Sequence, residues 1–472
     1  MTTRILVLGD FSGRASRGVC DPGTVRVRRR LPVDRDDLEA RLSELSVEVR
    51  LRSGEILKVR ELDDLEPDAF LHTLPSFDGL RSLRARLMNP KSFAAAAEEL
   101  RASGPSQAED QGDSGVDANM NSGDAPAGIP IPDDLFAAAL EATVPRSQPV
   151  GELDGQAFAE QLAREIVAPF VEPLGDPRLP ELLALVDRAF GEHVRAVLHD
   201  PAFRSVEDAW RGLHRLTRAL ETGPQLEVRL LDVSVEELLK ANGASGLPVL
   251  GGGGEGARAD LVVVLHRFDA TPEDAELLAA LAQGVDEQGG VLVADAHPRL
   301  AGCSSDRIDA DPDLWTDEMG PEAGTGWAAA RREHAGQVAL VVNRLPMRMP
   351  YGPRGAALDS LKFDELGGLS RDDCPWGSGA WGVAELFGRT ATDQGQAPSS
   401  LKAQLALERQ PLVLLEEHGE WAQVPCAEVE LGDRAIAGLA AKGLSAIRCV
   451  RGADAVLVGP VVALNGAALG AR

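Results

Sequence analysis

The chain has 472 residues, 44% of them hydrophobic, and a formal net charge of −26. Its length is typical of two or three globular domains. The negative charge disfavours binding to nucleic acid or to anionic membranes, because both require a basic surface. No apolar run approaches the roughly 18–20 residues that span a bilayer, and the apolar stretch at residues 5–8 is too short for a signal peptide. We therefore expect a cytoplasmic protein with no nucleic-acid or membrane partner.

The sequence lacks the common metal-binding and catalytic motifs. The five cysteines are an odd number without C-x-x-C spacing, which argues against a disulfide framework and a zinc site. The eight histidines are scattered and form no H-E-x-x-H or comparable ligand pair. No G-x-S-x-G surrounds a serine. We expect no catalytic residue, no cofactor and no metal.

One glycine-rich run resembles a nucleotide-binding fingerprint. Gly251, Gly253 and Gly256 match G-x-G-x-x-G, but that motif requires a helix directly after the last glycine. Here residues 257–260 lead into an apolar strand instead. A flexible loop is the favoured interpretation, and a nucleotide-binding cytosolic enzyme is a remote alternative.

A polar segment divides the chain in two. Residues 101–134 are rich in glycine, serine, aspartate and asparagine, and Val116 and Met120 are the large apolar side chains of its first 24 positions. Such a segment buries too little surface to offset its ordering entropy, which predicts a flexible acidic linker. The expected domains are therefore residues 1–100 and residues 135–472.

The first domain shows the pattern of a small α+β module. Apolar alternation predicts strands, helical spacing predicts helices, and Asp34 is a good helix N-cap. The basic run at residues 26–30 alternates like a solvated edge strand. The expected strands are residues 5–8, 47–51 and 56–62, and the expected helices begin near residues 34, 67 and 77.

The second domain alternates helices with short apolar strands, a pattern typical of an α/β fold with a mixed or parallel sheet flanked by helices. Ser234 is expected to cap a short helix. The expected helices are residues 135–140, 158–170, 179–198, 206–220 and 273–283, and the expected strands are residues 226–230, 261–265, 291–294 and 338–345.

Residues 1–100 resemble the small subunit of the contractile sheath of type VI secretion systems. The resemblance is carried by RILVLGDFSGR at residues 4–14 and continues through residues 31–38, 59–70 and 80–88. The second domain resembles the large sheath subunit, most specifically in LHDPAF and VEDAWRGL at residues 198–213. The resemblance to the large subunit continues through residues 230–238, 345–352, 376–381 and 428–443.

The resemblance implies a structural function. Sheath subunits assemble around an inner tube and repack to drive it outward, so the implied partners are further copies, other sheath subunits, an inner-tube protein, a baseplate and an AAA+ unfoldase. Neighbours exchange strands, for which residues 5–8 and 456–464 are candidates. The resemblance ends near residue 465, before the region that large subunits use in assembly. A non-polymerising adaptor or baseplate-associated protein is therefore the alternative.

Several residues are candidates for interface or fold-defining positions. Aromatic residues make up 4% of the chain and include one tyrosine, so each is expected to mark a packing or contact position. Trp210 is expected in the core, with an interface anchor as the alternative, and for Trp376 and Trp381 the two interpretations are even. Asp10 is expected to cap the turn after the first strand. The full set is Asp10, Phe11, Trp210, Arg211, Tyr351, Trp376 and Trp381.

Overall fold

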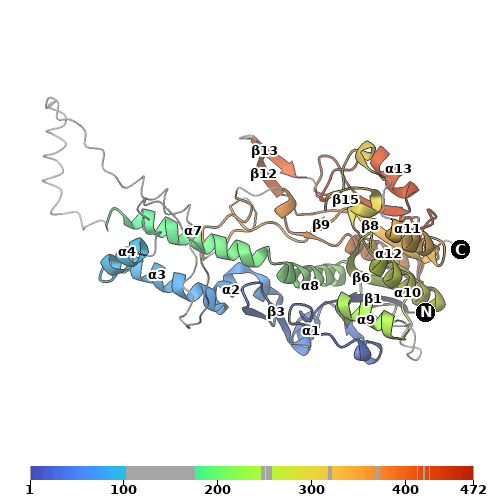
Figure 1. Ribbon diagram of the computed structural model, residues 1–472, viewed down its shortest axis with the longest axis horizontal. Helices are drawn as coiled ribbons and strands as arrows, with labels where there is room; N and C mark the ends of the chain where they lie inside the picture. The colour runs from blue at the N-terminus through green and yellow to red at the C-terminus, as the bar shows by residue number, and fades with distance from the viewer. Residues whose placement is uncertain are drawn as a thin grey trace, which may run out of the picture. The chain divides into compact units, whose positions relative to one another are not determined.

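The structure is a computed structural model (Figure 1). It describes residues 2–102, 176–245, 250, 258–316, 321–353, 355–358, 360–367, 371–411, 413–417, 420–424 and 426–470. The chain forms two compact units. The first unit joins Met1–Thr73 to Val194–Arg472, and the second is Leu74–His193. The start of the chain thus belongs to the same unit as its second half.

The first unit is built on a nine-stranded sheet with the strand order β11-β15-β14-β8-β7-β6-β1-β5-β2. Strands β14, β8, β7, β6, β1 and β5 run parallel, whereas β15 and β2 are antiparallel to their neighbours. The strands are β1 (Thr3–Gly9), β2 (Leu31–Val33), β5 (Leu226–Asp232), β6 (Leu261–Phe268), β7 (Val291–Ala296), β8 (Val338–Val342), β11 (Leu405–Leu407), β14 (Leu444–Cys449) and β15 (Val456–Val458).

Helices cover both faces of this sheet. Leu6 and Leu8 of β1 share a core with Leu277 and Leu281 of α10. Because side chains alternate along a strand, the other residues of β1 face the opposite side, where α12 packs against β1, β5, β6 and β7. The helices of this unit are α1 (Leu38–Leu45), α2 (Pro67–Thr73), α8 (Pro201–Ala219), α9 (Val235–Ser245), α10 (Pro272–Gln288), α11 (Pro321–Ala330), α12 (Ala380–Gln394) and α13 (Asp433–Ala441).

Shorter elements complete the first unit. Three strand pairs lie outside the large sheet: β3 (Val47–Arg50) with β4 (Ile56–Val59), β9 (Leu345–Pro346) with β10 (Trp376–Gly377), and β12 (Val413–Glu417) with β13 (Glu420–Val424). The 3-10 helices are η1 (Pro22–Val27), η2 (Leu62–Leu65), η4 (Pro298–Ala301), η5 (Pro312–Leu314), η6 (Ala335–Gln337) and η7 (Arg371–Asp373).

The second unit is helical where the structure describes it. It contains η3 (Pro75–Phe77), α3 (Asp78–Met88), α4 (Phe93–Ala102) and α7 (Leu179–Leu198) up to His193. The Phe77 and Phe190 rings stack with centroids 6.0 Å apart, and Arg84 Nε donates to Asp187 Oδ1 at 2.7 Å. Residues on either side of the expected linker therefore share one core here.

The predicted α/β class is confirmed, with a mixed sheet between helices. The helix expected at residues 179–198 matches α7. Helix α8 begins at Pro201 instead of residue 206, because Asp200 Oδ1 accepts a hydrogen bond from Ala202 N at 2.8 Å and proline fits a first helical turn. The helices expected at residues 135–140 and 158–170 and the glycine run at 251–256 lie outside the described residues. Of the linker expected at 101–134, the first two residues are the end of α4, and the rest also lies outside the described residues.

Two local predictions were wrong. Residues 26–30 form no strand, because η1 occupies Pro22–Val27 and Arg28 donates a hydrogen bond to the buried carboxylate of Glu237. The strand expected to reach residue 345 ends at Val342, where Asn343 has a φ of 80°. Its side chain donates to the Val429 and Ile447 carbonyls at 2.7 and 2.8 Å, which holds that turn. The candidate exchange strands lie inside the sheet, since β1 and β15 each have two neighbours, and their exchange between chains stays a prediction.

Candidate functional site: the junction between the two ends of the first unit

The central feature of the first unit is the insertion of β1 among strands that lie more than 200 residues later in the chain. β1 pairs in parallel with β5 along its whole length and with β6 from Ile5 to Leu8. Ile5 and Val7 are 0% exposed, so the strand is covered on its faces as well as its edges. Burying each such side chain contributes about 1.5–3 kcal/mol. We call the contacts between residues 2–73 and residues 194–470 the junction.

The end of β1 packs closely against β6. A Cβ at Gly9 would lie 2.7 Å from Leu265 Cδ1, closer than a side chain can approach. After this glycine the chain turns, and Asp10 Oδ1 and Oδ2 accept hydrogen bonds from Arg14 N and Ala15 N at 2.6 and 2.8 Å. Burial, together with repulsion from Asp232, raises the pKa of Asp10. Asp10 thus organises the turn that follows β1.

Phe11 and Trp210 join this turn to α8. Both side chains are 0% exposed, and their rings meet edge to face with centroids 5.4 Å apart. Trp210 Nε1 donates to the Phe11 carbonyl at 2.7 Å, so the indole satisfies a buried backbone acceptor. On the other side, Asp232 Oδ1 accepts from Phe11 N and Ser12 N at 2.9 and 3.0 Å. The turn is therefore held from α8 and from the end of β5.

Glu237 in α9 is the main charged contact of the junction. Its side chain is 0% exposed and accepts hydrogen bonds from Arg14 Nε and Nη2 at 2.9 and 2.7 Å. Arg28 Nη1 and Nη2 donate to the same carboxylate at 2.9 and 2.6 Å, and Asp21 N donates a fifth hydrogen bond at 2.8 Å. Burial alone would raise the pKa of Glu237, but the hydrogen bonds from Arg28 and Arg14 outweigh it and lower that pKa well below its usual range.

Sequence reasoning missed Glu237 as a binding residue, although one signal was present. Glu237 Oε2 accepts from Ser234 N at 3.0 Å, and Ser234 Oγ accepts from Glu237 N at 3.2 Å. This reciprocal pair is a capping box, which the Ser-x-x-Glu spacing encodes. The approach of Arg14 and Arg28 depends on tertiary structure and had no local signal.

A second buried network holds α8 through Glu207 and Arg211. Arg348 is 8% exposed and donates to Glu207 Oε1 at 2.7 Å and to both Glu365 oxygens at 2.7 and 3.0 Å. Arg211 Nε donates to Glu207 Oε1 at 2.9 Å, and Arg211 Nη2 donates to the Tyr351 hydroxyl at 3.1 Å. Although burial opposes its charge, the attraction of Glu207 and Glu365 raises the pKa of Arg348. Arg211 and Tyr351 are thus internal partners.

The remaining tryptophan candidates are also internal. Trp376 and Trp381 are 5% and 4% exposed. Trp376 Nε1 donates to the Arg371 carbonyl at 2.9 Å, and Trp381 Nε1 donates to Asp208 Oδ1 at 3.3 Å. The structure therefore brings Asp10, Phe11 and Trp210 together at the junction and places the other candidates in adjoining parts of the same unit. Contact of any of them with another chain stays a prediction.

The described residues offer neither a metal site nor a membrane-spanning helix. Within the described ranges, no group of three or more histidine, cysteine, aspartate or glutamate side chains is arranged to hold a metal ion. None of the helices in the described part of the chain is long and apolar enough to cross a membrane.

Comparison with known proteins gives two matches. The family described as "EvpB/VC_A0108, tail sheath N-terminal domain" matches residues 180–245 and 252–460, which is more than half of the chain. The type VI secretion system sheath protein TssC1 of Pseudomonas aeruginosa is 27% identical over 228 residues, covering 45% of this chain and 46% of the relative. The chain thus spans about half the length of the curated relative that it matches. This chain belongs to the tail sheath N-terminal domain family.

Proposed function

We propose that this chain is a structural subunit of a type VI secretion contractile sheath, in which a small-subunit-like segment is joined to a large-subunit-like segment. The family match over residues 180–460 supports the large-subunit part. The fusion rests on the resemblance of residues 1–100 to the small subunit. The observation that carries the proposal is β1, which completes the sheet of the second segment from the other end of the chain.

Covalent joining has a physical rationale at this junction. β1 has no independent stability as a strand, because its backbone groups and both faces are satisfied by β5, β6 and the surrounding helices. A connecting segment keeps two binding partners at an effective concentration on the order of millimolar. It also enforces equal numbers of the two parts. A fused subunit would therefore assemble its sheet without a bimolecular step.

A structural function agrees with the chemistry at the end of β1. Doubly wound sheets bind ligands beyond the carboxyl ends of their strands, where the strand order reverses. Here β5 and β6 lie on opposite sides of β1, and the space beyond β1 is filled by Phe11 and Trp210, which are fully buried. This supports a subunit without catalytic function. It also weighs against the nucleotide-binding alternative, although the glycine run at 251–256 lies outside the described residues.

The proposed partners follow from the sheath function. They are further copies of the chain, other sheath subunits, an inner-tube protein, a baseplate and an AAA+ unfoldase, all in the cytoplasm. Electron microscopy of the purified protein, alone and with the products of its neighbouring genes, tests this proposal. We expect tubes or rings. Monomers under every condition would reject polymerisation, and recovery of baseplate proteins without sheath would favour the adaptor.

The fusion itself needs a separate test. A protease site inserted beside Gly123 allows the two segments to be separated after folding, and a scrambled, uncleavable insertion is the matched control. We expect the cleaved segments to co-elute in size-exclusion chromatography, because β1 remains held by β5 and β6. Dissociation of the segments on cleavage would contradict the proposed small-subunit and large-subunit pairing.

A further inference from the structure

Two carboxylates hold the beginning of α12. Asp208 on α8 accepts hydrogen bonds at Oδ1 from Ser378 N at 3.1 Å and from Trp381 Nε1 at 3.3 Å. Asp295 on β7 accepts at Oδ1 from Gly379 N at 2.9 Å and from Ala380 N at 3.2 Å. These donors are consecutive along the chain, so the carboxylates lie close together at the first turn of the helix. Three elements, α8, β7 and α12, meet at this pair.

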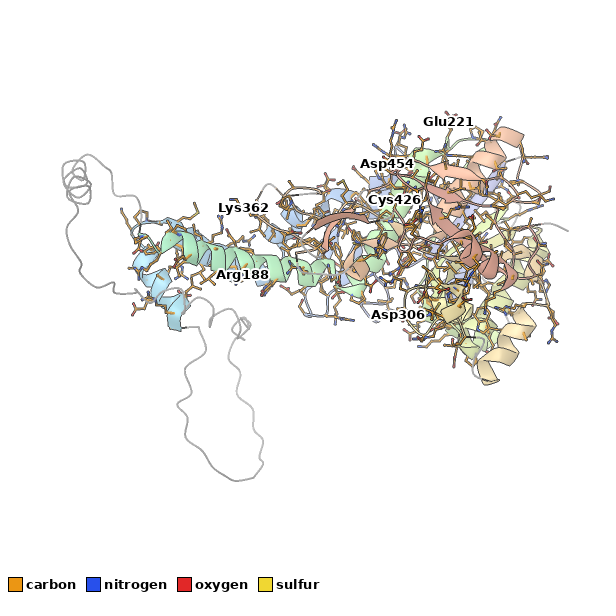
Figure 2. The ribbon with its side chains drawn as sticks, turned by 90° about the horizontal axis from the view of Figure 1, so that it is seen from above. Arg188, Glu221, Asp306, Lys362, Cys426 and Asp454 are labelled. Atoms are coloured by element: carbon orange, nitrogen blue, oxygen red, sulfur yellow. The ribbon has the colours of Figure 1, made fainter. Side chains whose placement is uncertain are left out.

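Among the described residues, no cation pairs directly with Asp208 or Asp295. Within the part of the chain that the structure describes, neither carboxylate has an arginine, lysine or histidine nitrogen within 4.0 Å. Arg344, beyond β8, is engaged by both oxygens of Glu428, at 3.0 and 2.7 Å. Arg267 on β6 donates to the backbone carbonyl of Asp306, a residue labelled in Figure 2, at 2.7 Å. Arg267 and Arg344 therefore make these hydrogen bonds with groups other than Asp208 and Asp295.

The charges facing the pair are mixed. Arg267 and Arg344 attract Asp295, and Glu207, beside Asp208 on α8, repels Asp208. The helix N-terminus favours negative charge, but its amides are shared between two carboxylates. Burial raises the pKa of Asp295 to about 6. Burial, together with repulsion from Asp295, raises the pKa of Asp208 to about 7.

We propose that Asp208 and Asp295 act as a proton-operated clamp that fastens α8 and β7 to the first turn of α12. Near and below neutral pH, protonation of the pair removes the repulsion between the two carboxylates. As pH rises both groups ionise, and the contact between α8 and α12 weakens. Trp210, which holds the turn after β1, lies two positions from Asp208 on the same helix. The clamp is independent of the proposed sheath function.

The sign of the effect follows from linkage. An aspartate whose pKa is higher in the folded state destabilises that state when ionised, so the unfolding constant rises with pH. With an ordinary unfolded-state value of about 3.9 and the folded-state pKa of about 7, Asp208 should increase the unfolding constant about 10-fold between pH 6 and pH 8. Ionisation of Asp295, whose folded-state pKa is about 6, raises the unfolding constant in the same way at lower pH.

Urea unfolding of the full chain at pH 6 and pH 8 tests the clamp. Asp208→Asn keeps the Oδ1 acceptor for Ser378 N but cannot ionise, so we expect it to lose the roughly 10-fold pH effect. Asp36→Asn is the matched control, because Asp36 is exposed, and it should keep the wild-type pH dependence. Unchanged pH dependence in Asp208→Asn would overturn the proposal.

A second measurement avoids dependence on a variant that fails to fold. Infrared spectroscopy of the wild-type protein at pH 6 detects protonated carboxyl groups directly. We expect such a band, and a decrease in its intensity as pH rises to 8. A wild-type protein with no protonated carboxyl at pH 6 would overturn the clamp whatever the behaviour of the variants.

Discussion

Replacing Glu237 with glutamine probes the charged contact of the junction. The substitution keeps the size of the side chain and one acceptor oxygen but removes the charge that Arg14 and Arg28 share. Both arginine side chains are mostly buried, at 17% and 15% exposed. They would then face an amide group that cannot neutralise them. The residues 14–28 that connect β1 to β2 would lose their main attachment to α9.

The magnitude can be worked from the contacts. Breaking a buried ion pair by removing one partner costs about 3–5 kcal/mol, because a buried charge is left uncompensated. Two arginines lose a partner here, but each retains some solvent contact, and Arg28 Nη1 also donates to the Asp232 carbonyl at 2.9 Å. We therefore expect Glu237→Gln to lower the free energy of unfolding by about 3 kcal/mol.

Urea denaturation at pH 7 measures this loss, with Glu236→Gln as the control. Glu236 is the neighbouring residue, is 55% exposed and pairs with Lys240 at 2.5 Å, so its loss should cost only about 0.3–0.5 kcal/mol. Because the pKa of Glu237 is lowered in the folded state, the wild-type advantage is full above about pH 4.3. It should decline as pH falls towards the lowered pKa. Equal effects of the two substitutions would refute the assignment of Glu237 as the main charged contact.

Two further substitutions test the packing of α8. Trp210→Phe leaves the Phe11 carbonyl without its donor and should lower the free energy of unfolding in urea by about 1–3 kcal/mol. Amide exchange in the turn after β1 should become faster. A loss below about 0.5 kcal/mol would contradict this role of Trp210. Gly212→Ala would place a Cβ into the Trp381 indole and should cost about 2–3 kcal/mol, which outweighs the gain of about 1 kcal/mol in helix propensity. Gly223→Ala, with nothing within 4 Å of its Cβ, is the control and should be near neutral.

The sequence predicted the elements whose signals are local. The period of apolar residues placed α7, and Ser234 was expected to cap the helix that is α9, where its Oγ accepts from Glu237 N. The apolar run at residues 5–8 predicted a strand, but not its position between β5 and β6 inside the sheet. That position depends on pairing with Leu226–Asp232 and Leu261–Phe268, and no local pattern specifies such distant partners.

The site residues likewise divide into those with a local signal in the sequence and those without one. Asp10 was expected to cap a turn, and its hydrogen bonds to Arg14 N and Ala15 N are local enough to be visible in the sequence. The buried network of Glu207, Arg348 and Glu365 was not predicted. Acidic and basic residues are common in this chain, and only the three-dimensional structure shows which of them lose solvent together.

The internal position of β1 in the sheet also constrains how the protein can fold during synthesis. Thr3 pairs with Leu226, about 220 residues later, and a ribosome adding about 5–20 residues per second needs roughly 10–45 s to make that stretch. Throughout this interval β1 has neither of its neighbouring strands. An apolar strand with two unpaired edges is prone to aggregation, so the early chain depends on chaperones or on non-native burial until β5 and β6 emerge.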